Sequence, residues 1–146
     1  MKKLEYKIDI KAPAKKVWEV MLGRDTYKEW TKVSWPDSDY DGKWAKDEKI
    51  RFFLEGKGGT LAIIDEFKPH ETILARHIAA LGPDGSEDYT SAEAKGWIGT
   101  LERYTFKESK GITTLTVEME TFPDWVKMFD DGWPKALEAL KKICEK

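Results

Sequence analysis

The segment "DDGWPKALEALKK" (residues 130–142) decides the fold, because it sets a glycine and a proline inside what otherwise reads as a helix. In a helix interior, glycine costs about 1 kcal/mol and proline about 3 kcal/mol relative to alanine. Apolar residues nevertheless recur every three or four positions from residue 122 to residue 144, in a phase that Pro134 does not interrupt. We therefore expect one long helix that starts near Pro123 and bends at Gly132–Pro134. Two helices that meet at Gly132 are the alternative, since the proline removes one backbone hydrogen bond.

The rest of the chain predicts a sheet for this helix to cover. Residues 4–10 alternate apolar and charged side chains, which is typical of a half-buried strand. Two short helices are expected next, within residues 13–23 and 25–33. Six further strands follow, separated by Gly, Pro and Asp turns: residues 37–44, 49–56, 60–67, 72–81, 97–106 and 112–122.

This order of strand, two helices, six strands and helix predicts an α+β fold with one curved antiparallel sheet of about seven strands. No repeat or change in composition divides the chain, so residues 1–146 are expected to form a single domain. Residues 82–96 form a long polar connection, and such connections are usually mobile or functional. This segment is therefore a candidate lid.

Composition excludes several classes of function. The chain has 146 residues, 40% of them hydrophobic, and a net charge of −2. No basic block indicates a nucleic-acid or membrane partner, and no leader or membrane-spanning run is present, so a cytoplasmic location is expected. Cys144 is the one cysteine, and neither His70 nor His77 has the spacing of a metal site. The sequence predicts no metal and no cofactor, and we expect a monomer or weak dimer.

The last hairpin indicates which side chains face the interior. If residues 108–111 form its loop, Lys107 lies opposite Ile112, and Glu102 and Tyr104 share the apolar face of Leu115, Val117 and Met119. An inward Glu102 is either a polar anchor or general acid/base for a small molecule, or a structural carboxylate. In the structural case Arg76, His77 or a tyrosine hydroxyl is its expected partner. Both faces of the His77 strand are apolar, so the direction of His77 stays open.

Seven tryptophans require a large core or a cavity to line. Phe129 and Trp133 lie on the helical stripe, with Trp125 close to it. Trp44, Phe52 and Leu54 alternate inward on the second and third strands. These side chains either form an aromatic wall around a hydrophobic ligand or simply fill the core.

The chain resembles the helix-grip fold of the START/polyketide-cyclase (SRPBCC) superfamily, and in particular its branch named for the activator of Hsp90 ATPase homologue. The resemblance rests on five segments: "IKAPAKKVWEVM" (10–21), "YKEWT" (27–31), "YDGKWAKDEKIRFF" (40–53), "GTLERYTFKESKGITTLTVEM" (99–119) and "GWPKALEALKK" (132–142). Asp47 stands in a turn where relatives often have glycine. The resemblance implies a deep cavity between sheet and helix. The superfamily includes lipid carriers, hormone receptors, cyclases and co-chaperone domains, so it leaves the function open.

Three functions follow as hypotheses. The first is the binding of a small apolar or aromatic molecule, with no catalytic residue assigned. The second is a co-chaperone-like domain whose partner is an Hsp90-type ATPase, and the third is a cyclase or hydrolase that uses Glu102 with Tyr104 or His77. We favour the first hypothesis, ligand binding, over the third, an enzymatic function. The candidate ligand-binding residues are Trp44, Phe52, Leu54, Glu102, Tyr104, Val117, Met119, Trp125, Phe129 and Trp133.

Overall fold

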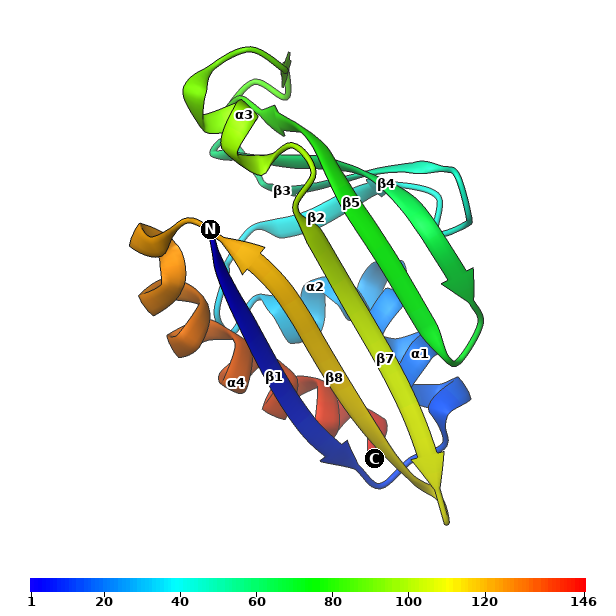
Figure 1. Ribbon diagram of the computed structural model, residues 1–146. Helices are drawn as coiled ribbons and strands as arrows, with labels where there is room; N and C mark the ends of the chain where they lie inside the picture. The colour runs from blue at the N-terminus through cyan, green and yellow to red at the C-terminus, as the bar shows by residue number, and fades with distance from the viewer.

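A computed structural model describes residues 1–146 and shows one curved antiparallel sheet with three helices on one side of it (Figure 1). In chain order the elements are β1 (Lys2–Ile10), α1 (Ala14–Leu22), α2 (Arg24–Thr31), β2 (Ser38–Gly42), β3 (Lys49–Leu54), β4 (Gly58–Lys68), β5 (Thr72–Leu81), β6 (Glu87–Asp88), α3 (Ala92–Trp97), β7 (Leu101–Ser109), β8 (Ile112–Thr121), the 3-10 turn η1 (Pro123–Trp125) and α4 (Val126–Cys144).

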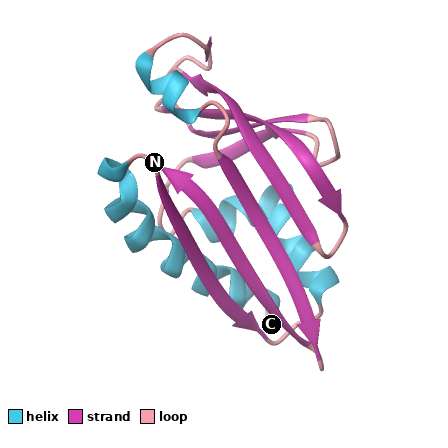
Figure 2. Ribbon diagram, viewed as in Figure 1, coloured by secondary structure: helices cyan, strands magenta, loops and turns pink.

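The sheet has the strand order β1-β8-β7-β5-β4-β3-β2, with the short β6 paired to β5. Figure 2 shows these strands as one layer, with α1, α2 and α4 behind it. The α+β prediction is confirmed, and β6 is the one strand beyond the seven expected. No helix combines the length and the hydropathy needed to cross a bilayer.

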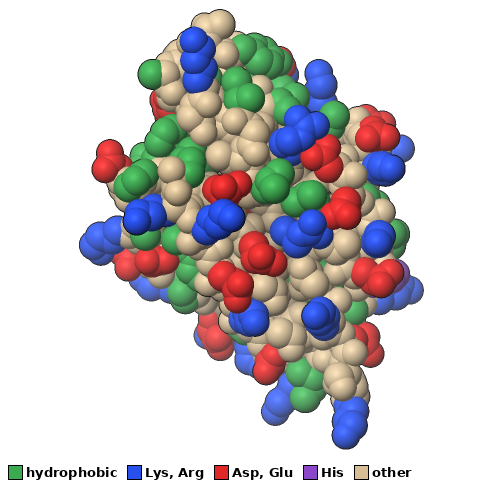
Figure 3. Space-filling model, in the orientation of Figure 1, with side chains coloured by type: hydrophobic (Ala, Val, Ile, Leu, Met, Phe, Trp, Pro, Cys, Tyr) green, Lys and Arg blue, Asp and Glu red, His purple; other side chains and the backbone are tan.

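The outer face of the sheet is a mixture of charges, which explains the alternation read from the sequence. Arg76 Nε lies 2.9 Å from Asp65 Oδ2, and Arg103 lies 2.9 Å from Glu66. Figure 3 shows acidic and basic side chains intermixed over this face. Arg76 therefore points outward and is no partner for Glu102.

Helix α4 runs without a break from Val126 to Cys144 and contains Pro134. The prediction of one long helix is confirmed, and two helices meeting at Gly132 are not found. Pro134 is exposed, whereas Trp133, Leu137 and Leu140 are buried in the main core. The proline ring therefore faces solvent and leaves the packing of the helix against the sheet undisturbed.

A close approach of Trp35 explains the glycine beside this proline. A Cβ atom at Gly132 would lie 2.7 Å from Trp35 Cζ2 and 2.9 Å from Cε2. The neighbouring Ser34 hydroxyl donates a 2.6 Å hydrogen bond to the Gly132 carbonyl. Gly132 thus lets the loop after α2 lie directly on α4.

The N-terminus of α1 is held by hydrogen bonds to the β7–β8 hairpin, which lies far from it in the sequence. No side chain next to this helix caps it. Instead, a Glu108 carboxylate oxygen accepts a 2.7 Å hydrogen bond from the Ala14 N–H. The Thr113 hydroxyl donates a second one, also of 2.7 Å, to the Ala12 carbonyl. The tip of the β7–β8 hairpin therefore fixes the place where α1 begins.

The register predicted for this hairpin was wrong by two residues. Lys107 lies opposite Thr114 rather than Ile112, because the turn contains only Lys110 and Gly111. Both turn residues have positive φ, 53° and 79°, as in the tight turns whose twist suits a two-residue hairpin. A shift of two residues leaves every side chain on its predicted face, and Glu102 lies opposite Met119 on the concave side.

The connection at residues 82–96 has structure that the sequence reading missed. It forms β6 and most of α3, and the Ser91 hydroxyl caps α3 by accepting a 3.1 Å hydrogen bond from the Ala94 N–H. Ala94 and Trp97, one helical turn apart, are buried together beside β5. Trp97 consequently ends a helix instead of starting a strand, and β7 begins at Leu101.

Candidate functional site

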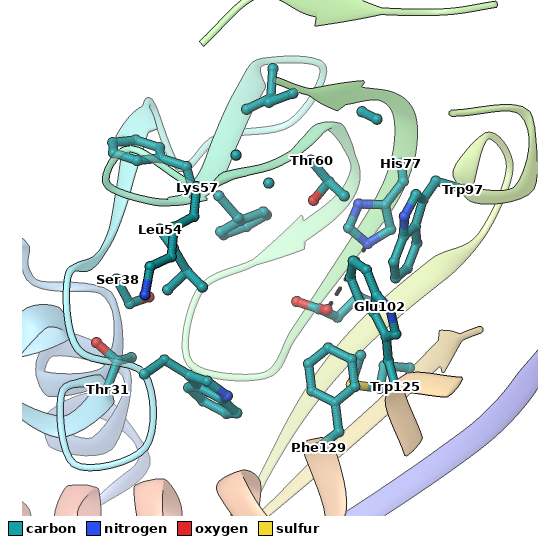
Figure 4. Close-up of a pocket in the computed structure, with 18 of the residues that line it drawn as sticks. Thr31, Ser38, Leu54, Lys57, Thr60, His77, Trp97, Glu102, Trp125 and Phe129 are labelled. Carbon is teal, nitrogen blue, oxygen red and sulfur yellow. Dashed lines mark ion pairs between the residues drawn. The ribbon is translucent and has the colours of Figure 1, made fainter. Parts of the chain in front are cut away.

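A cavity of about 760 Å³ lies between the concave face of the sheet and the helices (Figure 4). Of the 31 residues that line it, 18 are hydrophobic. This size and lining fall within the range of small-molecule sites, which are mostly apolar with a few polar groups. The cavity is therefore the candidate functional site.

Aromatic rings from separate elements form much of its wall. Trp44, in the connection after β2, lies 5.6 Å from Phe52 of β3 between ring centroids. Trp35 lies 6.3 Å from Phe129 of α4 and 5.3 Å from Trp133. These rings contact one another edge-on or tilted, which is the arrangement aromatic pairs prefer. The wall is thus held together by ring contacts that need no ligand.

Glu102 and His77 form a polar cluster in the wall, on neighbouring strands. Ala75 of β5 pairs with Glu102 of β7, so His77, two residues further along β5, shares the concave face with Glu102. His77 Nε2 lies 4.0 Å from Glu102 Oε1, and the two side chains are only 6% and 12% exposed. The dashed line in Figure 4 marks this contact. The Tyr104 hydroxyl donates a hydrogen bond to Glu102 Oε2.

Burial shifts the pKa values of both His77 and Glu102. It lowers the pKa of His77 to about 4, so the imidazole is neutral at pH 7 and its contact with Glu102 is not an ion pair. Burial also raises the pKa of Glu102, although the hydrogen bond from Tyr104 acts in the opposite direction. No lysine or arginine lies within ion-pair distance of Glu102. The carboxyl group therefore has a hydroxyl partner but no cationic one.

Three buried polar atoms of the wall have no hydrogen-bond partner: His77 Nδ1, Trp44 Nε1 and Trp133 Nε1. A buried polar atom left without a partner costs about 1–3 kcal/mol. Each of these atoms is itself shielded by neighbouring side chains, so the wall carries this cost without offering the atoms to a bound molecule.

Nine of the ten candidate residues named from the sequence line the cavity: Trp44, Phe52, Leu54, Glu102, Tyr104, Met119, Trp125, Phe129 and Trp133. Val117 does not. It lies between Tyr6 of β1 and Tyr104 of β7 and is 0% exposed, in the same core cluster as Leu137. Its face was assigned correctly, but this part of the concave face is packed core.

Two of these nine occupy other elements than expected. Trp44 lies beyond the end of β2 instead of on the strand, because β2 stops at Gly42, whose φ is 126°. Trp125 belongs to the turn η1 that precedes α4, and it remains 39% exposed. Trp125 therefore lies at the rim of the cavity.

The sequence reading missed Trp35 and Trp97 as wall residues and left the direction of His77 open. The three-residue spacing of Ala94 and Trp97 was an available signal for α3. Trp35 lies in a loop, where no periodicity indicates a direction. His77 points into the cavity because the register of β5 with β7 places it there.

A sheet that curves around a long C-terminal helix, with a cavity between them, defines the helix-grip class of proteins. Within that class the chain belongs to the family described as "Activator of Hsp90 ATPase homolog 1-like protein", whose profile matches residues 11–145. None of the curated proteins compared with the chain matches it.

Solved structures agree with this fold. The Aha1 dimer from Colwellia psychrerythraea superposes with a TM-score of 0.73 at 20% identity, over 99% of this chain and 97% of that one. Protein MLL2253 from Mesorhizobium loti gives 0.71 at 16% identity, over 97% and 96%. DynU16, from the dynemicin biosynthetic locus, gives 0.70 at 16% identity, over 99% of this chain but 47% of that one. At these identities the similarity concerns the fold.

Proposed function

We propose that this protein binds a small hydrophobic or aromatic molecule in the cavity between its sheet and α4. The observation that carries the proposal is the cavity itself, about 760 Å³ in volume and walled by aromatic rings around Glu102. Packed protein cores contain few spaces larger than a water molecule. A space of this size therefore holds solvent or a ligand, and its apolar wall favours a ligand.

The binding residues in this proposal fall into two groups. Trp44, Phe52 and Leu54 on one side, with Phe129 and Trp133 of α4, supply apolar contact area. Glu102 and Tyr104 supply hydrogen bonds at the polar part of the wall, near Met119, while Trp125 covers the rim. The protein is taken to act as a single domain of residues 1–146 in the cytoplasm, as a monomer or weak dimer.

A fluorescence titration with a neutral apolar probe, N-phenyl-1-naphthylamine, tests the proposal. Thr60 lines the cavity and is the position for a blocking variant, Thr60→Phe. Thr116→Phe is the matched control, because Thr116 lies outside the cavity lining, paired with Lys7 and Thr105.

We expect saturable binding by the parent protein and by Thr116→Phe, and at least about tenfold weaker binding by Thr60→Phe, since the added ring occupies the site. Native mass spectrometry of the purified protein adds an independent readout, a co-purified small molecule of defined mass. Equal probe binding by all three proteins contradicts the proposal, as does the lack of both probe binding and a co-purified molecule.

An interaction with an Hsp90-type ATPase is the second candidate. It is supported by the family description and by the Aha1 dimer among the similar structures. The measurement is the ATPase rate of Hsp90 with and without this protein, and an unchanged rate removes the candidate.

The His77–Glu102–Tyr104 group supports a third candidate, an enzymatic reaction of the cyclase or hydrolase type. If a substrate is found, Glu102→Gln tests it directly. Turnover that survives this substitution leaves Glu102 without a chemical role.

A further inference from the structure

The charged residues that line the cavity are predominantly acidic. Lys57 is the only basic one among them, and no arginine is present. Four carboxylates line the same space: Asp88, Glu93, Glu102 and Asp124. Because His77 is neutral at pH 7, no other cation offsets them. Even without a charge on Glu102, the other three carboxylates outnumber the one lysine, so the wall carries more negative than positive charge.

Lys57 and Glu102 occupy different parts of the wall. Lys57 lies in the exposed turn between β3 and β4, whereas Glu102 is buried on β7. Figure 4 shows Lys57 with Leu54 and Ser38 on one side of the cavity, and Glu102 with His77 on the other. An anionic group placed deep in the cavity would therefore meet a carboxylate and no basic side chain.

One oxygen of Glu102 has no donor within the protein. Oε2 accepts from the Tyr104 hydroxyl, but Oε1 is 4.0 Å from His77 Nε2, which is beyond hydrogen-bond length. Buried carboxylates in proteins are normally paired with a cation or fully hydrogen-bonded. Since Glu102 lines the cavity, the missing donor can come from a bound molecule.

Aromatic rings lie on the same side of the cavity as Glu102. Trp97 lies 5.7 Å from the His77 ring and 5.5 Å from Trp125, measured between ring centroids. Figure 4 shows Trp97, Trp125 and Phe129 around Glu102. The face of an aromatic ring attracts a cation within about 6 Å of its centroid. Burial raises the pKa of Glu102, and a protonated nitrogen beside it would oppose this effect by favouring the charged carboxylate. The same nitrogen would lie near the aromatic rings on this side of the cavity.

We propose that the cavity selects aromatic or amphiphilic amines, whose protonated nitrogen donates to Glu102 while the apolar body contacts the aromatic wall. The selection acts against carboxylic acids with the same apolar body. This inference rests on the proposed function, because it names the ligand class of the same cavity.

Three probes that share one ring system test the selection: 2-naphthylmethylamine, 2-naphthalenemethanol and 2-naphthoic acid. Each is titrated at pH 7.5 by isothermal calorimetry and by displacement of N-phenyl-1-naphthylamine. We expect the amine to bind roughly 10- to 100-fold more tightly than the alcohol, as is typical of a hydrogen bond to a charged group. The acid is expected to bind most weakly.

Two variants then assign the selection to Glu102. Glu102→Gln keeps the shape but removes the group that can become negatively charged beside the amine, and should abolish the advantage of the amine over the alcohol. Glu118→Gln is the matched control, because Glu118 is an exposed carboxylate on β8, outside the cavity lining. It should retain the full advantage.

The inference is overturned if the acid binds as tightly as the amine, or if Glu102→Gln keeps the preference. The comparison of the three probes on the parent protein decides the first point even if the variant does not fold. If the alcohol and N-phenyl-1-naphthylamine bind but the amine has no advantage, the ligand class is wrong and the proposed function stands. If no probe binds and no small molecule co-purifies, the proposed function falls as well.

Discussion

Replacing Gly132 by alanine should destabilise this protein, although alanine is the better helix former. The new Cβ would lie 2.7 Å and 2.9 Å from two atoms of the rigid Trp35 indole ring. That ring lies against Phe129 and Trp133, and the adjacent Ser34 is hydrogen-bonded to the Gly132 carbonyl. Trp35 therefore has little freedom to move away.

The sign of the effect follows from two opposing contributions. Exchanging glycine for alanine inside a helix contributes about 1 kcal/mol of stability. Forcing an extra methyl group into a packed contact costs about 1–3 kcal/mol. We expect Gly132→Ala to lower the free energy of unfolding by about 1 kcal/mol. In a Trp35→Ala background the contact is absent, and the same substitution should raise it by about 1 kcal/mol.

The assay is a double-mutant cycle measured by urea unfolding. Far-ultraviolet circular dichroism is the appropriate signal, because removing Trp35 changes the tryptophan fluorescence. The coupling between the two positions should be about 1–3 kcal/mol. Lys135→Ala, at an exposed position of α4, is the control and should change stability by less than about 0.5 kcal/mol. An equal gain from alanine with and without Trp35 would refute the reasoning.

Three further results are expected. First, in the Glu102→Gln background stability should fall by up to about 3 kcal/mol as the pH drops from 6.5 to 4, because the unfolded His77 takes up a proton that the folded ring, with its pKa of about 4, does not. With Glu102 present, this loss of stability should be smaller. The pKa of Glu102 is raised in the folded protein, so Glu102 contributes stability at low pH that is lost as the pH rises through that value. A pH profile of stability that is unchanged by His77→Gln would contradict this account. Second, Cys144, buried with its pKa raised to about 11, should react with 5,5′-dithiobis(2-nitrobenzoic acid) only in denaturant, so rapid labelling of the native protein would show the thiol to be accessible. Third, Gly96→Ala should lower the free energy of unfolding by about 1 kcal/mol in urea titrations, because the cost of the added methyl group against the Phe122 ring exceeds the gain in helix propensity; no loss of stability would mean that this ring moves freely.

The fold was predicted correctly where apolar residues recur with the period of a strand or a helix, because that period shows which face is buried. The alternation in residues 4–10 and the stripe in residues 122–144 each record such a face, and β1 and α4 follow them. Parity gave the direction of Glu102 in the same way. It survived the wrong register because a shift of two residues changes the partner and not the face.

These patterns could not predict which inward side chains line the cavity and which are packed in the core. Val117 and Met119 share one face of β8, yet only Met119 reaches the cavity. The difference depends on where α4 covers the sheet, which is a tertiary property without a local pattern. Trp35 illustrates the same limit, because a loop side chain is directed by what it packs against.

The connection at residues 82–96 was misread for a different reason. Its polar composition suggested an irregular loop, but two buried side chains, Ala94 and Trp97, are enough to fold α3 onto β5. A short helix with one apolar face is easily overlooked among charged neighbours. The segment therefore lines the cavity as ordered structure, through Asp88 and Glu93, and Trp97 directly follows it.

The place of β1 at the sheet edge has a consequence for biosynthesis. This strand pairs with β8 alone, and the Ala14 N–H at the N-terminus of α1 donates its hydrogen bond to Glu108. β1 and α1 thus find these partners only among segments that are translated much later, and such distant pairing slows folding. A nascent chain halted before residue 112 would leave β1 without its strand partner.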